Sequence, residues 1–336
     1  MTTLVSGGAG YVGSHAVVAL HAAGRHVVML DDFSNARPDV VAELRMLTTP
    51  DLTVIEGDAA DGTAVRRLCD EHDVDSIVHF AAHKSIPESF ADPLRYYRNN
   101  LLSTLSLAEI AVERGIDRFV FSSSAVVYGT AGQLPVTEET PPAPQSPYGT
   151  TKLMCERILA DAAASSGLRV VILRYFNPVG AHGSGRIGEL PVAAGQNLVP
   201  AVMRVALGES DRLQVFGDDY DTRDGTAVRD FVHVMDLAEG HLAALEADLG
   251  SHQCRVFNLG TGVGTTVLEL AAAAETATGR PIPYEITARR PGDIVESWAD
   301  CSRAADELGW NAERDVAQML ADHWRFVNCR PDASAY

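Results

Sequence analysis

Tyr148 and Lys152 stand four residues apart in the segment Tyr148-Gly-Thr-Thr-Lys152 and are the first candidates for chemistry. Lysine occurs only at Lys84 and Lys152 among 27 basic residues, and the other 25 are arginine. A lysine in such a chain indicates a position where a compact ammonium group is needed. On a helix, positions i and i+4 share a face, so the phenol and the ammonium can point into one cleft. There the ammonium would favour the phenolate and could also hydrogen-bond a ribose. Taken alone, the pattern is more typical of an ordinary exposed helical pair.

A glycine-rich turn near the start of the chain predicts a dinucleotide site. The apolar or β-branched residues Thr3-Leu4-Val5 precede the turn Gly7-Gly8-Ala9-Gly10-Tyr11-Val12-Gly13. Residues 14–23 are predicted to form a helix and residues 25–30 a second strand, which is the context that such a fingerprint requires. Glycines let the backbone approach a pyrophosphate at the helix N-terminus. Asp31 ends the second strand, where its carboxylate can accept ribose hydroxyls and would repel a 2′-phosphate, so NAD is favoured over NADP. The alternative is a tight turn without a ligand.

Composition narrows the class of protein. A chain of 336 residues with 46% hydrophobic content predicts one large domain or two closely joined ones. The formal charge of −18 disfavours nucleic acid and anionic membranes as partners. The 5 cysteines are scattered without a Cys-x-x-Cys pair, which indicates neither a disulfide framework nor a metal site. We see no secretory leader and no membrane span, so a reducing cytoplasm is the expected location.

Strand and helix patterns alternate through the first half of the chain. This alternation predicts an α/β fold with a doubly wound parallel sheet of the Rossmann type. Polar residues follow the predicted strands, where ligands of such sheets bind. We expect a dinucleotide-binding domain over residues 1–176, to which segments near 230–258 and 298–325 return. Residues 177–336, rich in glycine, proline and loop arginines, are expected mainly to form a smaller substrate-binding α/β region.

Ser124 is a candidate partner for Tyr148. It closes the run Ser122-Ser123-Ser124 after a predicted strand and could share a proton or hydrogen bond with an oxygen that Tyr148 also touches. Serine, tyrosine and a supporting lysine suit proton transfer at a secondary alcohol while a nicotinamide takes hydride. Strand-end capping is the alternative for Ser124. Asn99 precedes a predicted helix over residues 101–113, where capping and cofactor contact are equally compatible with an asparagine.

These motifs together resemble the extended short-chain dehydrogenase/reductase family. The resemblance rests on the glycine turn, on Ser122-Ser123-Ser124-Ala125-Val126-Val127-Tyr128-Gly129 and on Tyr148-x-x-x-Lys152. Two further segments are similar to epimerases of UDP-sugars within that family, Arg174-Tyr175-Phe176-Asn177-Pro178-Val179-Gly180-Ala181 and Val228-Arg229-Asp230-Phe231-Val232-His233-Val234. The resemblance extends almost from end to end and implies a homodimer.

The resemblance also implies roles for individual residues. Tyr148 would be the catalytic base, Lys152 its support and Ser124 its hydrogen-bond partner. The residues that would contact NAD are Gly7, Gly10, Tyr11, Val12, Gly13, Asp31, Asp32, Phe33, Ser34, Asn35, Ala36, Asp58, Ala59, Phe80, Ala81, Ala82, Lys84, Asn99, Ser124, Tyr148, Lys152 and Phe176. Those that would hold the UDP-sugar are Lys84, Ser124, Tyr148, Asn177, Asn197, Leu198, Phe216, Arg229, Arg290, Asp293 and Ser297.

The implied reaction is oxidation of a sugar at C4 followed by the reverse reduction, which interconverts UDP-glucose and UDP-galactose through a 4-ketose. Nucleotide-sugar 4,6-dehydratases and decarboxylases share the scaffold, but the dehydratases resemble one another in an Asp-Glu pair where this chain has Ala125-Val126. A non-catalytic NAD-sensing module is a further alternative, which the complete Ser/Tyr/Lys set disfavours. Ser297 stands where many relatives carry a tyrosine beside the hexose, and its small side chain would leave room for UDP-N-acetylhexosamines. A neutral change filled by a shifted loop explains Ser297 equally well.

Overall fold

The computed structural model describes residues 1–189, 197–290 and 292–329. Its largest feature is a parallel sheet in the order β10-β6-β5-β4-β1-β2-β3. The strands are β1 (Thr2–Ser6), β2 (His26–Asp31), β3 (Thr53–Glu56), β4 (Ser76–His79), β5 (Arg118–Ser124), β6 (Arg169–Tyr175) and β10 (Cys254–Leu259). The prediction of a doubly wound parallel sheet is confirmed. The chain reverses its direction of travel across the sheet at β1, so a crevice opens between the carboxyl ends of β1 and β4.

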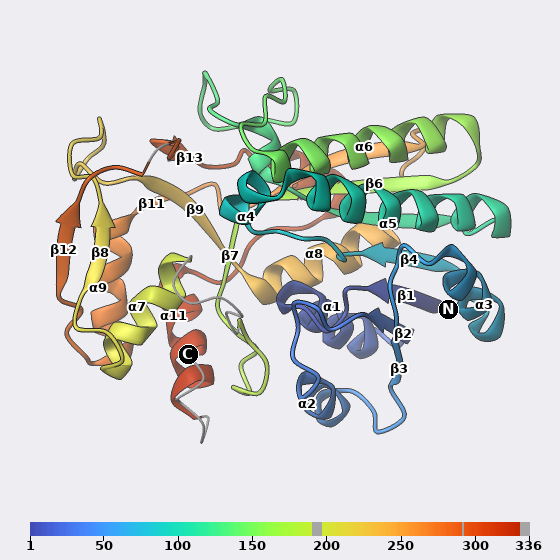
Figure 1. Cartoon of the computed structure of the whole chain (residues 1–336), viewed down its shortest axis with the longest axis horizontal. Coiled ribbons are helices and arrows are strands. Elements are labelled where there is room, and N and C mark those ends of the chain that lie inside the picture. The colour runs from blue at the N-terminus through green and yellow to red at the C-terminus, as the bar shows by residue number, and fades with distance from the viewer. Residues whose placement is uncertain (190–196, 291, 330–336) are drawn as a thin grey trace.

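Helices cover both faces of this sheet (Figure 1). They are α1 (Tyr11–Ala22), α2 (Val40–Leu47), α3 (Gly62–His72), α4 (Ile86–Ala91), α5 (Pro93–Arg114), α6 (Pro147–Ser165), α8 (Val234–Glu246) and α10 (Ser302–Leu308), with a 3₁₀ turn at Ala125–Tyr128. Successive strand residues face opposite sides. Val5 packs in the cluster of α1 and α8, and its neighbour Leu4 packs in the cluster of α3, α5 and α6.

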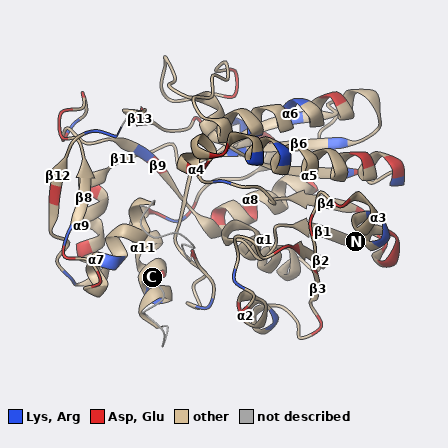
Figure 2. Cartoon of the chain, viewed as in Figure 1, with Lys and Arg blue, Asp and Glu red and all other residues tan. Residues whose placement is uncertain are grey.

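A second, smaller unit lies beside the carboxyl ends of these strands (Figure 1). Its strands are β7 (Asn177–Val179), β8 (Leu213–Phe216), β9 (Val228–His233), β11 (Gly264–Thr266), β12 (Tyr284–Thr287) and β13 (Glu296–Ser297), and its helices are α7 (Leu198–Leu207), α9 (Val267–Thr278) and α11 (Val316–Asn328). β9 pairs with β7, β11 and β13, while β8 pairs with β12. Apolar residues of α7, α9 and α11 form a separate core. Acidic residues are spread over both units (Figure 2).

The chain crosses between the two units more than once. β10 completes the large sheet, α8 packs against α1, and α10 packs against β10. In contrast, α11 packs against α9 and α7 in the smaller unit. We propose that residues 1–176, the α8–β10 segment and α10 form the dinucleotide-binding unit, and that α11 belongs to the other. Among the described residues, no helix combines the length and apolar character needed to cross a bilayer.

A buried ion pair joins α6 to the sheet. The Arg174 guanidinium on β6 donates to both carboxylate oxygens of Glu156 on α6, with an Nη2–Oε2 distance of 2.6 Å, and both side chains are less than 8% exposed. Ser123 Oγ on β5 also donates to Glu156 Oε1. One carboxylate therefore holds α6, β5 and β6 together.

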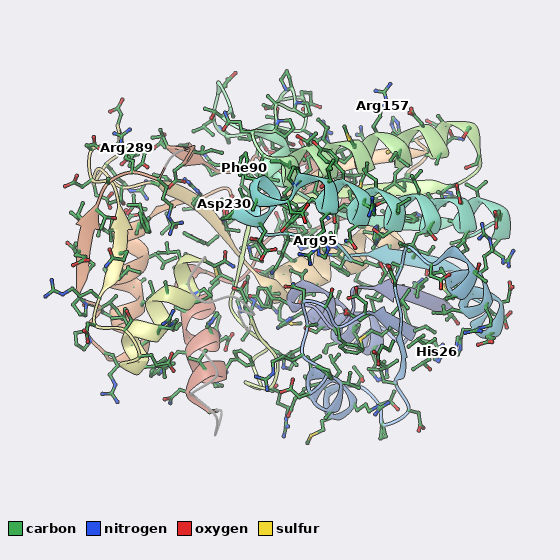
Figure 3. The ribbon with its side chains drawn as sticks, viewed as in Figure 1. His26, Phe90, Arg95, Arg157, Asp230 and Arg289 are labelled. Atoms are coloured by element: carbon green, nitrogen blue, oxygen red, sulfur yellow. The ribbon has the colours of Figure 1, made fainter. Side chains whose placement is uncertain are left out.

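We predict that Glu156→Ala lowers the free energy of unfolding by about 3–5 kcal/mol, because it leaves the Arg174 charge buried without its partner. Denaturant titration followed by circular dichroism measures the loss. Asp161→Ala is the matched control on the same helix, because its partner Arg157 is 81% exposed (Figure 3) and the pair contributes at most ~1 kcal/mol. Equal losses in the two variants would contradict the assignment.

Candidate active site

The glycine turn forms a cradle between β1 and α1. Gly10 caps the N-terminus of α1 without a side-chain hydrogen bond, so the first N–H groups of the helix can meet an anion. Gly7 has a φ of +73°, and a Cβ there would lie 2.6 Å from Ala81 N. A Cβ on Gly13 would lie 2.1 Å from Gly7 O. Only glycine fits these two positions, and the open helix terminus that they expose fits a dinucleotide pyrophosphate.

Asp31, at the end of β2, ties the cradle to the following loop. Its Oδ2 accepts from Ala9 N at 2.8 Å, and its Oδ1 accepts from Phe33 N at 2.9 Å. Burial is the largest influence on the Asp31 carboxyl and raises its pKa. Each oxygen keeps a second lone pair that a ribose hydroxyl can use. The segment after β4 closes the other side, since Phe80 N and Ala81 N both donate to Ser6 O.

A cavity of about 500 Å³ adjoins the segment after β4. Its lining residues come from several parts of the chain. Asp58 and Asn99, both expected at the cofactor, line it. The other lining residues, which no motif indicated, are Ala60, His83, Asp92, Leu94, Arg95, Arg98 and Leu102. Figure 3 shows Arg95 beneath α5. These side chains come from the segment after β3, the segment after β4, and α5 with its N-cap Asp92, so only the fold could assemble them.

The interpretation of Asn99 as a helix cap is wrong. α5 begins at Pro93, and Asp92 is its N-cap, with Oδ1 accepting from Arg95 N at 3.2 Å. Asn99 therefore lies within the helix, and its Nδ2 donates to Asn100 Oδ1 at 3.2 Å. A proline in the first helical turn, preceded by an aspartate, is a favoured helix start. The apolar pattern begins only at residues 101–113, so a prediction based on that pattern misses this start.

Tyr148 and Lys152 lie on the buried face of α6. The helix begins at Pro147, and Ser146 caps it by accepting from Gly149 N at 3.1 Å. Tyr148 is 9% exposed and Lys152 is 4% exposed, so the reading of an exposed helical pair does not apply. Lys152 Nζ donates to the main-chain oxygen of Ser122 at 2.8 Å.

Ser124 makes the capping contact and also reaches Tyr148. Its Oγ accepts from Val126 N at 3.3 Å, which is the capping contact, and its hydroxyl also hydrogen-bonds the Tyr148 phenol and thereby lowers the pKa of that phenol. Burial is nevertheless the larger influence and raises the pKa of Tyr148 far above its ordinary value. The expectation of a phenol made acidic by Lys152 is therefore wrong for the chain by itself. Burial likewise lowers the pKa of Lys152 to about 8.

Tyr175 is a neighbour of this group that sequence reasoning did not single out. Ser122 Oγ donates to the Tyr175 hydroxyl at 2.9 Å, and the proximity of Tyr175 raises the pKa of Tyr148 further. Tyr175 ends β6 and pairs with Ser124 in the parallel register. Its position at a strand end was the one sign in the sequence that it could lie at the site.

Three of the residues expected at the UDP-sugar, Arg229, Asp293 and Ser297, lie together at β9. Arg229 on β9 donates to Asp293 Oδ1 at 2.5 Å, and Ser297 on β13 is its partner in the strand register. The Arg290 guanidinium lies 3.7 Å from the ring centre of Phe216, at the end of β8. Beside Arg229, the buried carboxylate of Asp230 (Figure 3) accepts from loop N–H groups and so shapes the backbone.

Lys84 and Asn197 meet at a residue that the sequence did not reveal. Asn197 Nδ2 donates to Glu189 Oε1 at 2.7 Å, and Lys84 Nζ lies 3.9 Å from the same oxygen. Asn177 starts β7, and Leu198 starts α7 directly after Asn197. Within the described part of the chain, no group of three or more His, Cys, Asp or Glu side chains could hold a metal ion.

Comparisons with known proteins all find similarity to enzymes named for nucleotide-sugar substrates. A family model described as GDP-mannose 4,6 dehydratase matches residues 4–323. The chain is 48% identical over 327 residues to UDP-glucose 4-epimerase of Bacillus subtilis (strain 168), covering 97% of this chain and 96% of that protein. The structure of UDP-glucose 4-epimerase from Bifidobacterium longum with NAD+ and UDP is 44% identical, with a TM-score of 0.93 and 99% of each chain covered. The UDP-Glc/GlcNAc 4-epimerase of Campylobacter jejuni is 35% identical, with a TM-score of 0.84 and coverage of 97% and 98%.

We predict that Lys152→Met changes how stability depends on pH. Lys152 loses its proton near pH 8 in the folded protein, against an ordinary value of 10.5. Between these values the unfolded chain binds one proton more, so the contribution of Lys152 to the unfolding free energy rises with pH, by at most about 1.4 kcal/mol per unit. The measurement is chemical unfolding at pH 7.5 to 10, with Lys84→Met as the control at the other lysine. A difference between wild type and Lys152→Met that does not vary with pH would contradict the burial argument.

Proposed function

Because the chain belongs to the extended short-chain dehydrogenase/reductase family, among its UDP-glucose 4-epimerases, we propose that it interconverts UDP-glucose and UDP-galactose. The enzyme would invert the configuration at C4 of the hexose through a transient 4-ketose, with NAD held in the cradle of β1 and α1. The observation that supports the proposal is that Tyr148, Ser124 and Lys152 come together at the carboxyl end of β5, on the same edge of the parallel sheet as that cradle.

The residues of this chain would hold NAD at both ends of the crevice. The open N-terminus of α1 would bind the pyrophosphate, Asp31 the adenosine ribose, and Asp58 and Asn99 the adenine edge. When bound, NAD supplies the acceptor for the C4 hydride, its later return, and a positively charged ring that favours a nearby phenolate.

Tyr148 would take the proton of the 4-hydroxyl as the C4–H bond breaks, and Ser124 would hydrogen-bond the same sugar oxygen. The ketose must then turn to present its other face, after which Tyr148 returns the proton. Lys152 would position the ribose and add positive charge near the phenol. No atom is gained or lost over the cycle, so only the configuration at C4 changes.

The substrate residues divide into a firm and a loose end. The half-buried Arg229, paired with Asp293, and Arg290, stacked on Phe216, would grip a nucleoside diphosphate. The Ser297 side chain is small and would leave a hexose beside them room to turn. A firm diphosphate grip together with a loosely held sugar is what the rotation of a ketose requires.

Elimination by a 4,6-dehydratase is the alternative that the name of the matching family model suggests. The 3₁₀ turn after Ser124 carries Ala125 and Val126, neither of which can act as an acid or a base. A non-catalytic NAD-sensing role would leave the buried Tyr148–Ser124 contact without a purpose. The products formed from a UDP-sugar distinguish both alternatives from epimerisation, because a dehydratase gives a different product and a binding module gives none.

The deciding experiment incubates purified protein with UDP-galactose or UDP-glucose, without added NAD, and follows the sugars by proton NMR. We expect the same mixture of the two epimers from either side. Tyr148→Phe should lower kcat by about 10²–10⁴-fold, because only the base is lost, while the Kd for UDP stays within about threefold. A 6-deoxy-4-keto product would identify a dehydratase, and the absence of any product a binding module. Wild-type rates in Tyr148→Phe would remove Tyr148 from the mechanism.

We also propose that UDP-N-acetylhexosamines are substrates, because Ser297, the register partner of Arg229, carries a small side chain at the position expected beside the hexose. Ser297→Tyr should lower kcat/KM for UDP-N-acetylglucosamine at least ~10-fold and leave that for UDP-galactose within about threefold, since only the larger substituent clashes. Ser297→Ala is the control of similar volume and should retain both activities. A wild-type protein that turns over UDP-galactose but not UDP-N-acetylglucosamine would refute this specificity.

We further propose a homodimer in a reducing cytoplasm. α5 and α6 expose apolar side chains on their outer surfaces, including Leu102, Leu105, Val112 and Met154, and a second copy could cover them. All five cysteines are free, as expected where thiols stay reduced.

A further inference from the structure

One face of α5 lines the cavity of about 500 Å³ beside the cofactor cradle. The lining residues of that helix follow the spacing of a single helix face, and they are Arg95 (Figure 3), Arg98, Asn99 and Leu102. Asp58, which is expected at the adenine edge, lines the same cavity from the segment after β3. The helix therefore places two arginines beside the residues that are expected to hold the adenine end of NAD.

His83, in the segment after β4, forms a fixed part of the cavity wall. Its N–H donates to Asn100 Oδ1 at 2.8 Å, and its carbonyl accepts from Asn100 Nδ2 at 3.1 Å. The centres of the His83 and Tyr96 rings lie 5.5 Å apart. Burial and then the charge of Arg95 lower the pKa of His83, while nearby carboxylates, among them Asp58, act in the opposite direction. The Arg95 guanidinium therefore lies within electrostatic reach of this wall.

Arg95 and Arg98 differ from most arginines of this acidic chain, which form ion pairs. At the other end of α5, for example, Arg114 pairs with Asp70 at 2.7 Å. Among the residues that the structure describes, no carboxylate lies within ion-pair distance of either the Arg95 or the Arg98 guanidinium. Asp92 lines the same cavity but caps α5, by accepting from the main-chain N–H of Arg95. Two exposed guanidinium groups are therefore available to a ligand.

The groups around the cavity fit an adenine ring better than a free anion. The carboxylates of Asp58 and Asp92 line the same cavity as the arginines and would repel a phosphate, but they do not disfavour an uncharged base. The amino group of adenine can donate to Asp58. An arginine guanidinium is planar and weakly hydrated, and it stacks on aromatic rings. The cavity therefore offers an acceptor for the edge of the base and guanidinium planes for its face.

We propose that Arg95 and Arg98 cover the outer face of the adenine of bound NAD and thereby slow the release of the cofactor. The inference rests on the proposed function, because it takes NAD as the resident ligand. It adds two residues to the cofactor site that neither the sequence motifs nor the resemblance indicated. A slow release suits an epimerase, because the hydride taken in the first half of the cycle must be returned from the same cofactor molecule in the second half.

The test measures how fast bound NAD exchanges on the holoenzyme. Purified protein with its bound cofactor is mixed with an excess of NAD that is radiolabelled in the adenine ring, and the label that stays with the protein through gel filtration is followed over time. Arg95→Ala/Arg98→Ala should exchange NAD about tenfold faster than wild type, because lost contacts raise mainly the dissociation rate. Each single variant should give a rate between those of wild type and the double variant.

Arg45→Ala is the matched control, because Arg45 is an exposed arginine of α2 in the same unit that also has no ion-pair partner among the described residues. This variant should exchange NAD at the wild-type rate. A double variant that exchanges no faster than wild type would overturn the proposal. An acceleration in Arg45→Ala as large as that in each single cavity variant would overturn it as well, since the net charge of the protein would then explain the effect.

A second double variant separates stacking on the base from attraction of the phosphates. Arg95→Lys/Arg98→Lys keeps both charges and replaces each planar group with a compact ammonium, so it should exchange NAD at least about threefold faster than wild type. Wild-type exchange in this variant would overturn the proposal, because charge alone would then suffice. So would an alanine double variant whose acceleration disappears at high salt, where attraction between exposed charges is screened.

The exchange of NAD is read without any turnover of sugar, which keeps this inference separate from the proposed function. A holoenzyme that exchanges NAD as expected but epimerises no UDP-sugar would refute the proposed function alone. An enzyme that epimerises UDP-galactose while both double variants exchange NAD at the wild-type rate would refute the role of the two arginines alone. Because both side chains are exposed, the variants should fold as wild type does, and circular dichroism checks this.

Discussion

The buried pair of Glu156 and Arg174 is the interaction on which the geometry of the site depends. Glu156 lies one helical turn after Lys152 on α6, and Arg174 lies one residue before Tyr175 on β6. Any slide or rotation of α6 would leave two charges buried without partners. A buried ion pair contributes little net stability compared with apolar packing, so its value here is in fixing one register. The helix that carries Tyr148 is held at a set height above the strand that carries Ser124.

Much of the fold was predictable because its signals are local. β3 covers residues 53–56, which begin with the β-branched residues Thr53, Val54 and Ile55. The glycine turn, the first helix and Asp31 also fell where the dinucleotide pattern placed them. The start of α6 ahead of Tyr148 follows from Ser146 and Pro147, a favoured cap and first residue. Parallel strands then bring their carboxyl ends to one edge, and with them the candidate residues that follow each strand.

The features that escaped prediction depend on contacts between distant segments. Glu189 sits in a loop without periodicity, and its ion-pair partner Lys84 lies more than one hundred positions earlier in the chain. The raised pKa of Tyr148 is a consequence of burial, which a motif of two residue types cannot express. Asn99 was misplaced for a different reason. The first two turns of α5 carry tyrosines and arginines in place of an apolar stripe, so a pattern search begins the helix too late.

The anchor of Lys152 is a main-chain carbonyl, that of Ser122, and this has an evolutionary consequence. A carbonyl oxygen belongs to every amino acid, so substitution at position 122 can change what the side chain does for Tyr175 without removing the acceptor that the ammonium needs. Descendants of this sequence are therefore free to vary at that strand position while the orientation of the lysine persists, and only a shift of the strand itself would abolish it.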